Sequence, residues 1–102
     1  MAFVKVANAS DIPVGHGSLV EANGRAVAVF NAGAGRFYAT SPVCPHEDGP
    51  LAEGWIEGDA IVCPWHGFDF DLGTGRCQVD ENLAIVVYPV RVQNGAVEVD
   101  LP

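Results

Sequence analysis

Two short segments each place one cysteine and one histidine close together, and they constrain the fold of this chain more than any other feature. The first is Cys44-Pro45-His46 and the second is Cys63-Pro64-Trp65-His66, with 16 residues between His46 and Cys63. The proline after each cysteine fixes one backbone dihedral and removes a hydrogen-bond donor, which stiffens both segments. Each segment is short enough to bring its thiol and its imidazole together in one turn. The spacing therefore predicts one metal centre held between two loops.

Two kinds of metal centre are compatible with two cysteines and two histidines. Zinc accepts this set, but its ligands are usually grouped as a cysteine pair followed by a histidine pair. A [2Fe-2S] cluster can instead place both cysteines on one iron and both histidines on the other, so each loop must give one ligand to each iron. The mixed pairs favour this cluster, and zinc remains the alternative.

The two segments resemble the cluster-binding loops of Rieske proteins. The resemblance runs through residues 44–51 and 63–71 and continues in the turn Leu72-Gly73-Thr74-Gly75. The part of the chain that carries it, residues 44–75, is about a third of the whole. It implies one [2Fe-2S] cluster as the cofactor. The residues that the resemblance assigns to binding both the cofactor and its metal are Cys44, His46, Cys63 and His66.

Residues beside these ligands depart from two groups of Rieske proteins. The Rieske subunits of cytochrome bc complexes join their loops by a disulfide, but Gly49 and Trp65 stand at those two cysteine positions. High-potential relatives place a serine and a tyrosine where this chain has Phe68 and Phe70. Neither phenylalanine can donate a hydrogen bond to sulfur. We therefore expect no disulfide, and a midpoint potential toward the low end of the Rieske range of about −150 to +300 mV.

Alternating apolar and polar residues, interrupted by glycine, asparagine and aspartate, indicate short antiparallel strands. Asn23-Gly24 and Asn94-Gly95 are typical of two-residue hairpin turns. No segment shows a long helical period, although residues 48–54 could hold a short helical turn. The expected strands are residues 3–7, 17–22, 25–31, 36–40, 61–62, 68–71, 83–88, 91–92 and 96–99.

The chain of 102 residues predicts a single all-β domain. The resemblance implies a Rieske-like antiparallel β-sandwich or small barrel. We expect a base sheet from about residues 1–41 and 79–102, with a cluster-binding lobe inserted at about 42–78. The residues expected in the core are Val27, Val29, Phe37, Ile85, Val87, Val90, Val97 and Val99.

Three further features stand outside the ligand set. Cys77 is expected to be a small buried hydrophobic residue, and His16 a surface residue. Many relatives carry a proline-rich third loop over the cluster, whereas residues 79–82 contain no proline.

The net charge of −8 comes from 13 acidic against 5 basic residues. Nucleic acids and anionic membranes need positive charge on the protein, so they are not expected as partners. A partner protein with a basic docking patch suits this charge. The sequence shows neither a signal peptide nor an apolar run of the roughly 20 residues that span a membrane. We expect a soluble, cytoplasmic monomer.

The resemblance implies a one-electron carrier that passes electrons from a flavin-dependent reductase to a terminal ring-hydroxylating oxygenase of a bacterial dioxygenase system. The alternative is the small Rieske-like subunit of an assimilatory nitrite reductase, whose members often lack the cluster ligands. The chain itself is not expected to be an enzyme, because it lacks a two-histidine, one-carboxylate iron site and a nucleotide-binding glycine motif.

Overall fold

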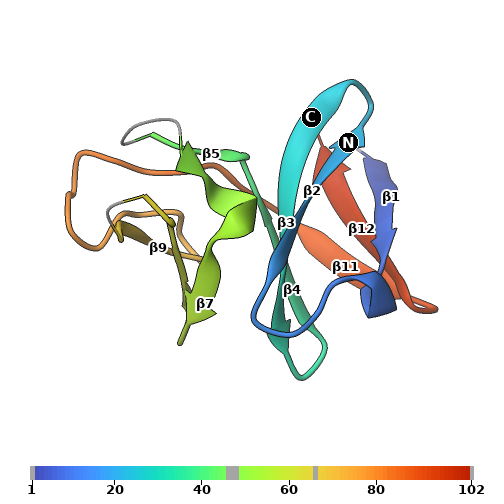
Figure 1. The fold of residues 1–102 in the computed structure, drawn as a ribbon. Helices are drawn as coiled ribbons and strands as arrows, with labels where there is room; N and C mark the ends of the chain where they lie inside the picture. The colour runs from blue at the N-terminus through green and yellow to red at the C-terminus, as the bar shows by residue number, and fades with distance from the viewer. Residues whose placement is uncertain (1, 46–48, 66, 102) are drawn as a thin grey trace.

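The computed structural model describes residues 2–45, 49–65 and 67–101, which fold into an antiparallel, almost entirely β structure (Figure 1). Its strands are β1 (Ala2–Asn8), β2 (Gly17–Ala22), β3 (Arg25–Gly33), β4 (Arg36–Thr40), β5 (Val43–Cys44), β6 (Gly49–Pro50), β7 (Trp55–Glu57), β8 (Ala60–Val62), β9 (Asp69–Asp71), β10 (Val87–Tyr88), β11 (Val90–Gln93) and β12 (Ala96–Leu101). Two short 3₁₀ turns, η1 (Ala9–Asp11) and η2 (Leu51–Glu53), interrupt them. No helix in these ranges is long and apolar enough to cross a membrane.

Two sheets form what we call the base, on the right of Figure 1. One has the strand order β1-β12-β11 and the other β10-β4-β3-β2, and all pairs are antiparallel. Both predicted Asn-Gly hairpins are present: Asn23 and Asn94 have φ of 52°, and the glycines after them have φ of 75° and 78°. These positive values match the turn whose twist suits paired strands.

The core of the base lies between its two sheets. Val27 and Val29 of β3 pack with Val97 and Val99 of β12, and all four side chains are fully buried. In β12 every second residue is buried, as the period of a half-buried strand requires. The sequence therefore predicted these four residues correctly.

Residues 42–86, which we call the lobe, connect β4 to β10 and carry two small sheets, β5-β6 and β7-β8-β9. Where the chain enters and leaves the lobe, Ser41 and Val86 lie side by side. The Ser41 N–H donates to the Val86 carbonyl at 2.9 Å, and the Val86 N–H donates to the Ser41 hydroxyl at 3.1 Å. The lobe therefore begins and ends at one point of the base.

A second buried cluster joins the lobe to the base. Phe30 projects from β3 and packs with Leu51, Ile61, Phe70 and other lobe residues, and all four of these side chains are fully buried. The Ile56 N–H also donates to the Gly15 carbonyl at 3.2 Å. Sequence alternation did not single out Phe30, because β3 is buried on both faces between the base core and the lobe.

Two details differ from expectation, and a third, the short helical turn, agrees with it. The strand expected over residues 83–88 is regular only at Val87–Tyr88, and Ala84 makes a single bridge with Arg76. Ile85 is buried as expected, whereas Phe37, Val87 and Val90 are only half-buried. Phe37 and Val90 lie at the margin of the base core. The helical turn expected within residues 48–54 is η2, and Asp48 lies outside the described residues.

Candidate metal centre

The first ligand loop is held between β5 and β6. Cys44 ends β5 and pairs with Gly49, and its side chain is fully buried. The Leu51 N–H donates to the Pro42 carbonyl at 3.2 Å and closes the loop behind this pair. His46 lies outside the described residues.

The second ligand loop connects β8 to β9. Cys63 follows β8 directly, and its N–H donates to the Phe68 carbonyl at 2.7 Å. The Trp65 N–H donates to the Cys63 sulfur at 3.4 Å, so the loop supplies a backbone donor to its own thiol. His66 lies outside the described residues. The short turn predicted around Cys63 is therefore present, and its thiol is fully buried.

The two loops approach each other at Gly49 and Cys63. A Cβ atom on Gly49 would lie 2.7 Å from the Cys63 sulfur and 3.4 Å from two ring atoms of Trp65. Real Cβ atoms essentially never come within 3.0 Å of another heavy atom, so no side chain fits at position 49 without a shift. In this chain, the two loops therefore pack against each other at a position that has no side chain.

This arrangement suits a metal that prefers sulfur. Cys44 and Cys63 come from opposite loops, are fully buried and belong to the same cluster of side chains. Thiolates in such a position are soft ligands, which select iron–sulfur clusters or zinc over calcium and magnesium. No disulfide joins the three cysteines, all of which lie in the described residues. The cysteine half of the predicted ligand set therefore fits a [2Fe-2S] cluster.

Aromatic rings occupy the positions where high-potential relatives place hydroxyl groups. Phe70 is fully buried in the same cluster as Cys44 and Cys63, and Phe68 packs partly buried against that cluster. The Phe70 ring offers no donor to a sulfur atom. The low midpoint potential stays a prediction, and this apolar environment is its structural basis.

The third loop is held by an aspartate instead of by proline. Asp80 accepts hydrogen bonds from the Asn82 N–H through its side chain, at 2.9 Å, and from the Leu83 N–H through its carbonyl, at 3.1 Å. Cys77 is buried, as predicted, and its N–H donates to the Leu83 carbonyl at 3.1 Å to close the loop. Sequence reasoning missed this role of Asp80, although an aspartate side chain often accepts a hydrogen bond from the backbone N–H two residues further on in a turn.

The net charge is divided unequally between the two parts of the molecule. The lobe has nine acidic residues and one basic residue, Arg76, so it carries a charge of −8. The base has four acidic and four basic residues, so its charge is zero. Only one ion pair that the structure describes joins the two parts, a contact of 3.5 Å between Arg36 and the exposed Asp59. A positively charged partner is therefore attracted to the lobe and not to the base.

Surface exposure differs among the residues beside the ligands. Trp65 is 47% exposed, whereas Leu51 is fully buried and Pro50 half-buried, so these three residues form a gradient from the interior to the surface of the lobe. His16 is exposed, as predicted.

Comparisons with known proteins agree with this arrangement. The ferredoxin subunit of 3-phenylpropionate/cinnamic acid dioxygenase from Escherichia coli K12 is 36% identical over 95 residues, which cover 91% of this chain and 88% of the relative. A chain of the complex of reduced oxygenase and oxidised ferredoxin in carbazole 1,9a-dioxygenase matches with a TM-score of 0.81 and 35% identity, covering 95% of this chain and all of the other.

A nitrite reductase small subunit from Mycobacterium tuberculosis shares the fold. The TM-score is 0.90, and the match covers 99% of this chain and 96% of the nitrite reductase subunit. The two sequences are 23% identical. At that identity the likeness concerns the fold alone.

A family model described as the Rieske [2Fe-2S] domain matches residues 2–89, which include both ligand loops and most of the base. The match spans the greater part of the sequence, and the paired loops with their two buried thiols have the architecture that such a cofactor needs. The chain therefore belongs to the Rieske [2Fe-2S] domain family, whose cofactor is one [2Fe-2S] cluster.

Proposed function

We propose that this protein is a one-electron carrier that takes electrons from a flavin-dependent reductase and delivers them to a terminal ring-hydroxylating oxygenase. The observation that carries the proposal is the meeting of the two ligand loops, where Cys44 and Cys63 are buried together and Gly49 leaves no room for a side chain. Two relatives above 30% identity, one a dioxygenase ferredoxin subunit and one a chain from an oxygenase–ferredoxin complex, support the same function.

The ligand set in this proposal is Cys44 and Cys63 on one iron, with His46 and His66 on the other. A bound [2Fe-2S] cluster of this kind accepts and releases one electron. The chain's own contribution is to hold the two sulfurs away from water and to donate the Trp65 N–H to Cys63. A hydrogen bond to a ligand sulfur favours the more negatively charged, reduced state, so this donor supports electron uptake.

The proposal includes protein partners and no substrate turnover by the chain itself. A lobe charge of −8 favours partners with basic docking patches and speeds their encounter. A carrier of this kind works in the cytoplasm as a monomer. The alternative, a nitrite reductase small subunit, has the support of fold likeness alone.

Absorption spectroscopy and electron paramagnetic resonance test the cofactor. The purified protein should be coloured, and its dithionite-reduced form should give a rhombic signal of low average g. A colourless protein with one zinc per chain would instead support the zinc alternative and remove electron transfer.

A second experiment tests the partners. The flavin reductase of a ring-hydroxylating dioxygenase should reduce the protein with NADH, and the rate should fall steeply as salt is added. Reduction only by a nitrite reductase large subunit would favour the alternative. A rate that salt does not change would count against docking on the acidic lobe.

A further inference from the structure

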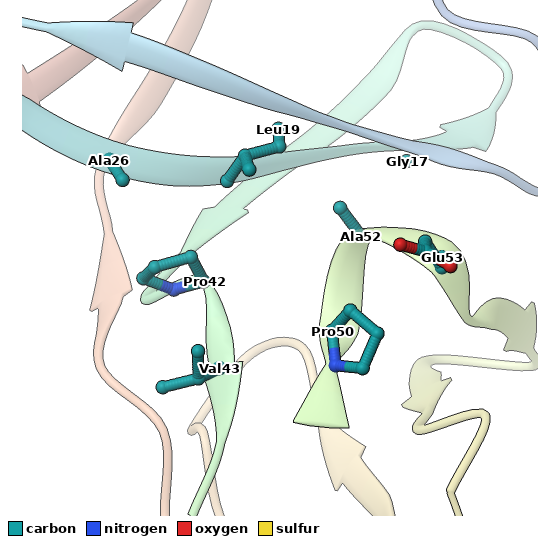
Figure 2. Close-up of a pocket in the computed structure, with 8 residues that line it drawn as sticks. All are labelled: Gly17, Leu19, Ala26, Pro42, Val43, Pro50, Ala52 and Glu53. Atoms are coloured by element: carbon teal, nitrogen blue, oxygen red, sulfur yellow. The ribbon is translucent and has the colours of Figure 1, made fainter. Parts of the chain in front are cut away.

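An apolar groove lies between the base and the first ligand loop (Figure 2). Its volume is about 460 Å³. Leu19 and Ala26 line it from the base, and Pro42, Val43 and Pro50 face them from the lobe. Gly17, Ala52 and Glu53 complete the lining, so only one of the eight lining residues is polar.

Close packing fixes one end of this groove. A Cβ atom on Gly17 would lie 2.4 Å from the Phe30 ring and 3.2 Å from the Ala52 carbonyl oxygen, so β2 runs directly against η2 there. Beyond Gly17 the two surfaces separate. Leu19 is left 61% exposed and Val43 46% exposed. Two large apolar side chains therefore lie exposed on one groove next to Cys44. Covering such a surface with a partner is energetically favourable.

A carboxylate stands at each end of the groove. Glu53 lines the η2 end. Glu21 pairs with Ala26 in the β2–β3 register, and paired residues project from the same face of a sheet, so Glu21 lies on the groove face beyond Leu19. Both glutamates are exposed, and neither has an ion-pair partner among the described residues. The groove therefore offers an apolar floor between two negative charges.

These features decide between possible occupants. A second copy of this chain would bring another lobe with a charge of −8 towards the first, which opposes self-association. A cationic partner gains from both glutamates, while its apolar side chain would cover Leu19 and Val43. Charge complementarity therefore selects a partner whose contact segment is apolar in the middle and basic on both sides.

We propose that this groove docks a segment of an electron-transfer partner in which apolar side chains lie between lysine or arginine residues. The proposal rests on the carrier function proposed above and names the chemistry of the partner's contact. Val43 precedes Cys44 directly, and Leu19 belongs to the base. A segment seated in the groove contacts both parts of the molecule and orients the Cys44 loop towards the partner.

The test is a titration of the ¹⁵N-labelled, cluster-loaded protein with acetylated and amidated tetrapeptides, followed by amide NMR shifts. Lys-Leu-Leu-Lys should give saturable shifts at Leu19, Ala26 and Ala52. Glu-Leu-Leu-Glu and Lys-Gly-Gly-Lys, which lack the charge or the apolar centre, should give none. The titration does not involve electron transfer, so the groove can fail while the carrier function stands.

Variants separate the two contributions to binding. Glu21→Gln and Glu53→Gln should each weaken the peptide about two- to five-fold, as expected for an exposed ion pair. Leu19→Ser should weaken it about five- to ten-fold through lost apolar contact. Glu81→Gln, a lobe carboxylate that does not line the groove, and Val92→Ser, an exposed strand residue of β11, are the matched controls and should leave affinity unchanged.

Three results would overturn the proposal. One is no saturable shift at the groove residues with Lys-Leu-Leu-Lys; another is equal binding of all three peptides. The third is a dimer in sedimentation equilibrium that dissociates on Leu19→Ser, because the occupant would then be a second copy. Leu19 is mostly exposed, so its replacement should not impair folding, and a thermal melt checks this.

Discussion

The base and the lobe are stabilised in different ways although they belong to one chain. The base has strands of up to nine residues, two valine pairs at its centre and no net charge. The lobe has strands of two or three residues and carries the entire charge excess of the protein. Short strands bury little surface by themselves, and nearby like charges repel. We therefore expect the base to keep its fold without the cluster, whereas the lobe depends on its packing against Phe30 and on its ligand loops.

The largest expected effect is loss of the cluster without loss of the base fold. Cys63→Ser should abolish the visible absorption and the resonance signal, because a proposed sulfur ligand is lost. The far-UV circular dichroism of the base strands should persist. Cys77→Ser, which changes another buried cysteine of the same cluster, is the control and should keep the iron. Full iron content in Cys63→Ser would show that the ligand assignment is wrong.

Gly49 tests whether the approach of the two loops is needed for cluster binding. Gly49→Ala should destabilise the lobe by about 1–3 kcal/mol, as is usual for overpacking, and should lower the iron content. Gly35→Ala in the base is the control. Its φ of 76° also strains a side chain, at about 1–2 kcal/mol, but the space around it is open. Iron per chain should fall only in the lobe variant; equal iron content in both would contradict this reading.

Phe70 tests how the apolar environment sets the potential. The unmodified protein should have a midpoint below about +100 mV. Phe70→Tyr adds a donor inside the cluster that holds both cysteines, and a hydrogen bond to a charged group contributes about 1.5–3 kcal/mol. Only the part of this energy that the reduced state gains over the oxidised state moves the midpoint, so for one electron the midpoint should rise by at most roughly 130 mV. Phe37→Tyr in β4 is the control, and a redox titration of both should show a shift in Phe70→Tyr alone.

Because the negative charge lies on the lobe, removing one charge there should slow docking more than removing one from the base. Glu81→Gln in the lobe should slow reduction by a basic reductase about two-fold at low salt. Asp11→Asn removes the same charge from the base and should change the rate less. Stopped-flow rates at two ionic strengths measure both. Equal effects would mean that total charge matters and that its position does not.

The smallest expected effect lies in the base. Arg91 donates to Glu98 at 2.6 Å and its guanidinium lies 4.3 Å from the centre of the Phe3 ring, but its side chain is 47% exposed. Exposed ion pairs contribute little, so Arg91→Met should lower the free energy of unfolding by less than about 1 kcal/mol. A urea titration measures the change. Iron content and midpoint potential should not move, and a shift in either would show that the base tunes the metal centre.

How much could be predicted depends on whether the signal is local. The Asn-Gly hairpins and the period-two core of β12 follow from short stretches of sequence, and both were predicted correctly. The proximity of Gly49 to the Cys63 sulfur needs two segments to meet, so it could be expected only through a resemblance. The burial of Phe30 depends on the lobe folding back onto β3, for which no local pattern exists.

The same reasoning applies to the groove and to residues 83–86. Leu19 and Val20 are adjacent and both apolar, so the sequence does not tell which of them is buried. Val20 packs against the base core, whereas Leu19 projects from the opposite face of the edge strand β2 and is exposed. Residues 83–86 carry an apolar pattern typical of a strand, but most of their backbone contacts go to the lobe turns, such as the Ile85 N–H donating to the Gly75 carbonyl at 2.8 Å. Tertiary contacts decided both cases.

The pairing of β1 with β12 has a consequence for biosynthesis. Ala2 lies opposite Leu101 and Asn8 opposite Ala96, so the first strand has to wait for the last one to leave the ribosome. Both cysteine loops emerge well before that moment. At a synthesis rate of about 5–20 residues per second, the interval from Cys63 to β12 lasts a few seconds. Cys44 and Cys63, which are buried in the folded protein, are therefore synthesised before the strand that completes the base.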